Sequence, residues 1–164
     1  MNEIERNILL EDFKGYLEEI WAWAYNEQVA YFLREARKLP LPKDIQDIFI
    51  TSSPQDGQTM LEDLWIFLEG YCIKVKDFLE VEKGTEPEII ELVPLKGEAK
   101  CVRITKQNFS FQTESGRRRE PKPMLEISIK LEDYQTLDFK AVEAVNCKHL
   151  LGIYRKYFAP LFPV

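Results

Sequence analysis

Hydrophobic and polar positions follow two different periods along this chain, and the change comes near residue 60. Over residues 3–38 apolar side chains recur every three or four positions, which is the spacing of one face of an α-helix. Pro40 and Pro42 end this pattern, because proline has no N–H to donate to a further helical turn. The pattern predicts an N-terminal helical arm over residues 1–42, and it leaves open whether the arm contains one helix or two.

Residues 43–61 join the two patterns. Their second part, TSSPQDGQ, groups serine, proline, aspartate and glycine, which are the typical residues of turns. We predict a connector here, and it is the best candidate for an internal boundary.

Beyond the connector, apolar and polar residues alternate with a period of two, which predicts β-strands. The clearest case is MLEISIKL at 124–131, where the apolar side chains point one way and the polar side chains the other. In all, seven segments have strand features: LWIFL, YCIKVKDF, EIIELVPL, AKCVRITK, NFSFQ, MLEISIKL and YQTLDFKA.

The last predicted element is an amphipathic helix, in which Ala144, Cys147, Leu151, Tyr154 and Phe158 step by three and four residues. This helix face matches the apolar face of the last two predicted strands. The two faces together predict one hydrophobic cluster made of Leu125, Ile127, Ile129, Leu137, Phe139, Leu151, Tyr154 and Phe158.

Seven antiparallel strands followed by one amphipathic helix, over residues 62–159, resemble the pleckstrin-homology-like (PH-like) fold. The resemblance lies in the number and order of elements, and no residue motif carries it. It implies an α+β protein in which residues 62–164 form a partly open antiparallel barrel closed at one end by the helix. The alternative is an α+β roll, with a curved antiparallel sheet wrapped on a helix. With the arm and the connector, either fold would form one compact domain.

Lipid-binding PH domains hold the phosphoinositide headgroup with basic residues in and around the first strand–strand loop. Here that turn is LEGY, which is tight and acidic. No lipid-binding residue is therefore carried over from the resemblance, and the fold alone does not select a ligand.

Composition narrows the functional classes. The chain has 164 residues and a formal net charge of −6, which argues against a broad nucleic-acid-binding face. Three cysteines without a CxxC pair and the single His149 support no zinc site, so we expect no metal and no cofactor. The N-terminus is acidic where a signal peptide would be basic, and no apolar stretch is long enough to span a bilayer. We therefore expect a cytoplasmic protein with buried, reduced cysteines.

The segment ESGRRREPKP at residues 114–123 contains four basic and two acidic residues. Arg117, Arg118, Arg119 and Lys122 are candidate ligand-binding residues, because such side chains form forked hydrogen bonds to phosphate or carboxylate. Proline and glycine bracket the run, so the interpretation that we favour is a solvated hairpin tip.

Trp21, Trp23 and Tyr31 make the arm aromatic and are the candidate assembly residues. Trp21 and Trp23 cannot share one helix face, so at least one should be exposed or contact a partner. The acidic side chains of the arm oppose insertion into an anionic membrane surface. We expect the arm to bind a protein partner or a second copy of the chain.

No P-loop, GxGxxG, GxSxG or HExxH motif and no candidate catalytic residue is present. We therefore predict a small cytoplasmic binding or interaction module without catalysis. Two alternatives stay open. One is a small-molecule-binding or catalytic α+β roll with a pocket between sheet and helix, and the other is a structural subunit that assembles through the aromatic arm. A wide pocket with a polar group inside it would favour the roll.

Overall fold

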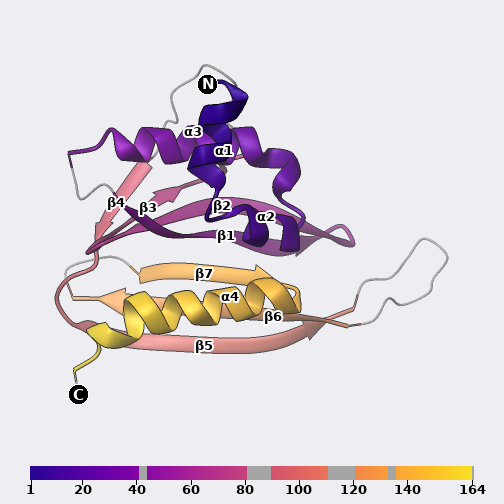
Figure 1. Cartoon of the computed structure of the whole chain (residues 1–164). Coiled ribbons are helices and arrows are strands. Elements are labelled where there is room, and N and C mark those ends of the chain that lie inside the picture. Colours follow the sequence, from indigo (N-terminus) through magenta and orange to yellow (C-terminus); the bar gives the residue numbers. More distant parts are fainter. Residues whose placement is uncertain (41–43, 81–89, 111–120, 133–135, 164) are drawn as a thin grey trace. The chain divides into compact units, whose positions relative to one another are not determined.

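A computed structural model describes residues 1–40, 44–80, 90–110, 121–132 and 136–163 of the chain (Figure 1). The chain divides into two compact units. The N-unit comprises Met1–Phe49 and Glu62–Pro94, and the C-unit comprises Ile50–Leu61 and Leu95–Val164. The predicted grouping of the whole chain into one domain stays a prediction.

The described strands are antiparallel and form two sheets, one with the order β1-β2-β3-β4 and the other with the order β5-β6-β7. These sheets do not close into a barrel within the described ranges, but the α+β class is as predicted. The strands are β1 (Ile45–Gln55), β2 (Gln58–Leu68), β3 (Tyr71–Val75), β4 (Ile90–Pro94), β5 (Ala99–Phe109), β6 (Lys122–Leu131) and β7 (Thr136–Val142).

The N-terminal arm contains three α-helices, where the sequence predicted one or two. They are α1 (Glu3–Leu10), α2 (Lys14–Glu19) and α3 (Asn26–Arg37), with a 3₁₀ turn at Trp23–Tyr25 before α3. The breaks were hidden because the short turns between the helices preserve the three- and four-residue apolar spacing. α1 begins with an N-cap, since the Asn2 side chain accepts a hydrogen bond from the Glu5 N–H at 2.8 Å.

Within the N-unit the arm helices lie on one side of the strands (Figure 1). α1 packs on α3, and Arg6 of α1 forms an ion pair with Glu27 of α3 at 3.1 Å. Strand β2 supplies the densest part of the core, because all five side chains of LWIFL, from Leu64 to Leu68, are buried. This apolar run, which the sequence predicted as a strand, is therefore buried on both faces.

The predicted connector over residues 43–61 is instead mostly a β-hairpin formed by β1 and the start of β2. Its turn has Asp56 and Gly57 at φ values of 50° and 77°, the left-handed conformation of tight hairpin turns. The strand was missed because Thr51 and Ser52, although buried, are polar and interrupt the apolar pattern. The end of this hairpin, residues 50–61, belongs to the C-unit.

The number of strands in the described ranges is still seven, because the sequence missed β1 but predicted two strands where β5 is one. AKCVRITK and NFSFQ were predicted as two strands, but AKCVRITK and the first two residues of NFSFQ form one continuous strand β5. The last two residues of NFSFQ lie outside the described residues. β5 pairs with β6 from Ala99 to Phe109, with one irregularity between Ala99 and Cys101. No turn residue separates the two segments, so a single strand through both was the simpler interpretation.

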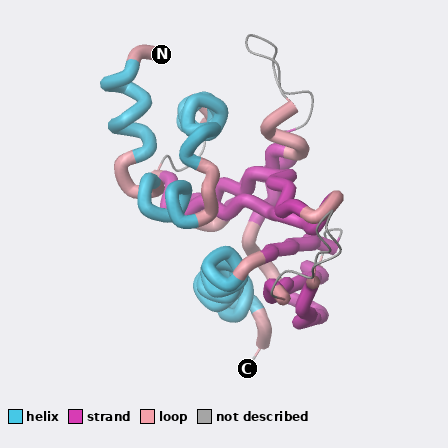
Figure 2. Tube along the Cα trace, turned by 90° about the vertical axis from the view of Figure 1, so that its right-hand side faces the viewer, coloured by secondary structure: helices cyan, strands magenta, loops and turns pink. Residues whose placement is uncertain are grey.

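In the C-unit, helix α4 (Ala144–Ile153) packs on β6 and β7 and continues as a π-helical turn and a 3₁₀ turn to Leu161. Figure 2 shows this helix beside its strands, near the C-terminus. The strand pairing places Ile127 opposite Phe139, and the Phe139 ring lies 5.3 Å from the ring of Phe158. The strand part of the predicted cluster is therefore buried as expected.

In the helix part of that cluster, Phe158 is buried as predicted, but the prediction is wrong by one position for Leu151 and Tyr154. Leu150 and Ile153 are buried, whereas Leu151 and Tyr154 are only half-buried. The reason is Asn146, a polar residue that is 3% exposed and occupies the buried face of α4. Because a polar side chain begins the buried stripe, the apolar spacing indicated a face rotated by one residue.

Asn146 connects α4 to the end of strand β1 within the C-unit. Its Nδ2 donates a hydrogen bond to the Ile50 carbonyl at 2.9 Å and lies 3.4 Å from the Ser52 Oγ. The Ser52 Oγ also accepts a hydrogen bond from the Val142 N–H at 2.9 Å. These buried bonds satisfy polar groups that would otherwise be costly to remove from water, and they fix the hairpin end to the start of α4.

Candidate functional site

The C-unit contains an open groove of about 500 Å³ between strand β5 and helix α4. The helix packs on β6 and β7, while Ile104 of β5, which pairs with the core residue Ile127, is 44% exposed. Residues 106–108 of β5 and 123–125 of β6 line the groove, together with Ala144, Cys147, Lys148 and Leu151 of α4. Leu125 is buried and forms an apolar floor with Pro123, which is two positions away on the same face of β6.

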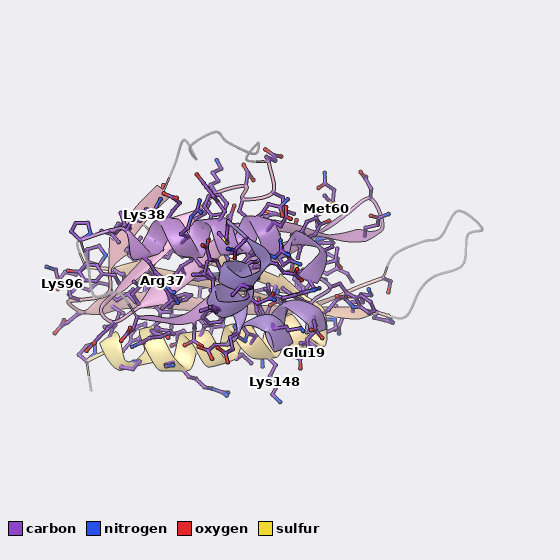
Figure 3. The ribbon with its side chains drawn as sticks, turned by 45° about the horizontal axis from the view of Figure 1, so that its top comes forward. Glu19, Arg37, Lys38, Met60, Lys96 and Lys148 are labelled. Atoms are coloured by element: carbon purple, nitrogen blue, oxygen red, sulfur yellow. The ribbon has the colours of Figure 1, made fainter. Side chains whose placement is uncertain are left out.

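A lysine lies on each wall of the groove, Lys106 on β5 and Lys148 on α4. Lys106 pairs with Leu125 across the strands, so both project from the sheet face that carries the helix. Neither lysine forms an ion pair with another residue in the described part of the chain. Figure 3 shows Lys148 pointing outward from the α4 ribbon, so its ammonium group is exposed.

Cys147 is the polar group deepest in the helix wall. Its Sγ lies 3.4 Å from the Ala141 carbonyl oxygen and 3.7 Å from that of Pro123, so the S–H donates to the backbone. Burial raises the pKa of the Cys147 thiol above its usual value. Because the thiolate is the nucleophile, this cysteine is poorly suited to covalent catalysis and is better suited to ligand contact.

The three cysteines differ in exposure, although the sequence predicted that all would be buried. Cys72 is buried, Cys147 is half-buried and Cys101 is exposed. Cys101 is exposed because it pairs with Lys130 on the polar face of the three-stranded sheet. His149 is half-buried on α4.

Glu143 directly precedes Ala144, which lines the groove, and its backbone has φ 77° and ψ 144°. This region is close to one that glycine almost alone occupies, and a side chain there costs about 1–3 kcal/mol. The Glu143 N–H donates to the Pro123 carbonyl at 2.8 Å, and its carboxylate forms an ion pair with Lys122. These two contacts hold Glu143 in its strained conformation at the start of α4.

The candidate ligand-binding residues from the sequence have different outcomes. Lys122 begins β6 and is already engaged by Glu143. Arg117, Arg118 and Arg119 lie outside the described residues, so their role as a ligand grip or a solvated tip stays a prediction.

Of the three assembly candidates, Trp21 alone presents most of its ring to solvent, with 83% of its surface exposed. Trp23 is half-buried, and the Lys14 ammonium lies 5.2 Å from its ring centroid. Tyr31 is half-buried and packs edge-on against Phe32 at 5.1 Å. The prediction that at least one of the two tryptophans is exposed is confirmed.

The backbone at Trp21 closes helix α2 in a conformation that favours glycine. Its φ is 61°, and its N–H bonds to the Glu18 carbonyl at 3.2 Å. The next N–H, from Ala22, bonds to the Leu17 carbonyl at 2.7 Å. This is the usual hydrogen-bond pattern of a helix that ends in a left-handed residue, a position that glycine occupies most often. A bulky residue there costs roughly 1–2 kcal/mol.

Two exposed carboxylates precede the exposed indole, so we call Glu18, Glu19 and Trp21 the α2 knob. Glu18 is within 3.8 Å of the Lys14 ammonium, an exposed pair of the kind that contributes little to stability. The knob therefore offers an apolar ring beside negative charge.

Charge is distributed unequally between the two units. The C-unit sequence contains 13 lysines and arginines and 9 aspartates and glutamates, a net charge of +4. The N-unit sequence contains 9 lysines and arginines and 19 aspartates and glutamates, a net charge of −10. The knob thus belongs to a strongly acidic unit, and the groove belongs to a basic one.

Sequence reasoning did not identify the groove or its two lysines. A weak signal exists in β5, where Lys106 continues the apolar positions Val102 and Ile104 on one strand face. A lysine at the end of such a row indicates that the face becomes accessible there. Nothing in the sequence indicates that Lys148 lies on the opposite wall.

Comparisons with known proteins assign the chain to no family, since no protein-family model, no curated protein and no solved structure matches it. None of the helices in the described ranges is long and apolar enough to cross a membrane. Those ranges also contain no group of three or more histidine, cysteine, aspartate or glutamate side chains arranged to hold a metal ion.

Proposed function

We propose that the protein is a non-catalytic interaction module whose C-unit binds an acidic segment of a partner protein in the groove between α4 and β5. The observation that carries this proposal is an apolar floor flanked by two lysines that have no ion pair in the described part of the chain. The apolar floor stabilises a buried side chain of the partner. The lysines select negative charge on either side of that side chain.

The size of the groove supports a side chain as the occupant. A volume of about 500 Å³ is in the range of small-ligand sites and accommodates one aromatic residue. An aromatic anchor removes about 150–250 Å² of its own surface from water. We therefore expect the bound segment to carry one bulky apolar residue with acidic neighbours.

A small-molecule site is the main alternative, because a pocket between sheet and helix is what the α+β roll was predicted to have. The groove is open to solvent and contains no pair of side chains suited to acid–base chemistry, among the residues that line it. Its one thiol is held protonated by burial, which raises its pKa. These features favour recognition of a protruding side chain. The PH-like fold and the cytoplasmic location are parts of the same proposal, supported by element order and composition.

The test is fluorescence anisotropy with a labelled peptide that has a central tryptophan, two glutamates on each side and glycine ends. A peptide with lysine in place of glutamate is the specificity control. We expect saturable binding of the acidic peptide alone, and binding weaker by about tenfold or more in a Lys106→Glu/Lys148→Glu variant.

A matched variant, Lys96→Glu/Lys130→Glu, makes the same change in net charge away from the groove. Figure 3 shows Lys96 well apart from Lys148, and Lys130 lies on the opposite face of the sheet from Lys106. This variant should bind the acidic peptide like the unmodified protein in physiological salt. Equal loss in both double variants, or equal binding of the basic peptide, would contradict the proposal.

A further inference from the structure

We infer that the α2 knob of a second copy of this chain occupies the groove, so that the protein associates with itself head to tail. This inference rests on the proposed function, because it assigns an occupant to the same groove. It commits to one contact: Trp21 on the apolar floor, with Glu18 and Glu19 beside Lys106 and Lys148.

The first argument is the conformation of Trp21. The residue lies in the left-handed region and is 83% exposed. Glycine at this position would relieve the backbone and remove the exposed indole. Sequences that break a local rule in this way usually do so at a functional position. An exposed aromatic ring with a strained backbone is expected to be buried in a contact that the free chain does not provide.

The second argument is chemical complementarity between the two surfaces. The knob offers an indole with adjacent carboxylates, and the groove offers a buried apolar floor with a lysine on each wall. A groove of about 500 Å³ has room for an indole ring. The lysines are also free to approach the ring face, an arrangement that attracts cations.

The third argument is the charge of the units that carry these surfaces. The N-unit has a net charge of −10 and the C-unit +4. The N-unit of one copy and the C-unit of another therefore attract each other, whereas two N-units repel each other. This favours a knob-to-groove contact over the contact between two arms that the sequence alone suggested.

A contact between two different surfaces is heterologous. Each copy in a pair keeps one free knob or one free groove, so association continues with concentration into rings or open chains. This property makes the inference separable from a symmetric dimer, in which both copies use the same surface.

The experiment is sedimentation velocity over a wide concentration range in about 0.15 M salt. The samples are the unmodified protein, the knob variant Trp21→Gly, the groove variant Lys106→Glu/Lys148→Glu, and an equimolar mixture of the two variants. We expect the unmodified protein to pass beyond a dimer as concentration rises. Each variant alone should stay monomeric. The mixture should form a heterodimer and stop there, because the groove variant supplies the only intact knob and the knob variant the only intact groove.

Two controls should still pass beyond a dimer in about 0.15 M salt. Ile8→Gln changes another exposed apolar residue of the arm, and Lys96→Glu/Lys130→Glu changes charge away from the groove. Trp21→Gly should keep or raise the midpoint of thermal unfolding, and Trp21→Asn provides a second variant that tolerates a left-handed backbone.

Three results would overturn the inference: a monomer at every concentration, self-association that survives in either the knob variant or the groove variant, or a mixture that does not form the heterodimer. The acidic-peptide titration separates this failure from that of the proposed function. If the Trp21→Gly variant binds the peptide while the unmodified protein stays monomeric, the groove is a binding site and its occupant is another protein. If neither the Trp21→Gly variant nor the unmodified protein binds the acidic peptide, both proposals fail.

Discussion

At the scale of single residues, Trp21 and Glu143 are the two positions where side chain and backbone conformation disagree most. Both have φ values in the range that L-residues rarely adopt, 61° and 77°. Trp21 belongs to the knob, and Glu143 directly precedes Ala144, which lines the groove. Strained residues of this kind persist only where surrounding contacts fix them or where function retains them.

The strain at Glu143 can be measured by comparing two substitutions that both remove its ion pair with Lys122. Glu143→Ala keeps the Cβ in the disfavoured conformation, whereas Glu143→Gly removes it. We expect the glycine variant to be more stable than the alanine variant by about 1 kcal/mol in urea denaturation, the reverse of the usual order of these residues. An alanine variant of equal or greater stability would show that the backbone here is not strained.

Asn146 gives the clearest residue-scale test of the fold. Replacing it with alanine leaves the Ile50 carbonyl without its buried donor and removes a partner of the Ser52 hydroxyl. We expect the free energy of unfolding to fall by about 1–3 kcal/mol, because a buried polar group left unsatisfied costs its desolvation. The neighbouring Val145 is exposed, so Val145→Ala is the matched control and should change stability by less than about 0.5 kcal/mol. A similar loss in both variants would mean that the helix start, and not the hydrogen bonds, sets the stability.

At the scale of elements, alternation alone predicted the strands whose two faces differ in polarity. β6 is the best example, since Leu125, Ile127 and Ile129 are buried and Lys130 is exposed. Elements with buried polar residues were predicted less well. Ser52 concealed strand β1 and Asn146 shifted the expected face of α4, because their hydrogen-bond partners are distant in sequence and no local pattern reveals them.

Asp63 of β2 provides a pH-dependent test of the N-unit sheet. Its carboxylate accepts a hydrogen bond from the Asp77 N–H at 2.9 Å, in the turn that follows β3. Burial raises the pKa of Asp63 above its usual value of 3.8. Since the folded state then binds the proton more tightly than the unfolded state, ionisation of Asp63 lowers stability as pH rises through and above 3.8.

Asp63→Asn keeps an oxygen that can accept the Asp77 N–H and removes the charge. We expect this variant to be more stable than the unmodified protein at neutral pH. The difference in stability should vanish as pH falls below the usual pKa of an aspartate carboxyl group. Thermal unfolding of both proteins between pH 3 and pH 7 measures this difference. A difference that is constant over this range would mean that the charge of Asp63 carries no penalty in the folded state.

At the scale of the whole molecule, the net charge conceals the unequal charges of the two units. A net charge of −6 argues against a basic binding face, yet the C-unit carries +4 and the N-unit −10. The sequence could not show this division, because the units are built from interleaved segments and the end of the β1–β2 hairpin belongs to the C-unit. For the same reason the groove was not predictable: Lys106 and Lys148 become its two walls only when β5 and α4 flank the same sheet face.

This unequal charge predicts how self-association depends on salt. The Debye length falls from about 30 Å at 0.01 M to about 3 Å at 1 M salt, so attraction between an acidic N-unit and a basic C-unit of another copy should be strong only at low salt. We expect sedimentation to show an association constant that falls by roughly tenfold between these limits while some association through the buried indole persists. The Lys96→Glu/Lys130→Glu variant removes the net positive charge of the C-unit but leaves the groove intact. It should associate more weakly than the unmodified protein at low salt and equally at high salt. Association that strengthens with salt in both proteins would instead indicate an apolar contact in which the charges of the two units oppose each other.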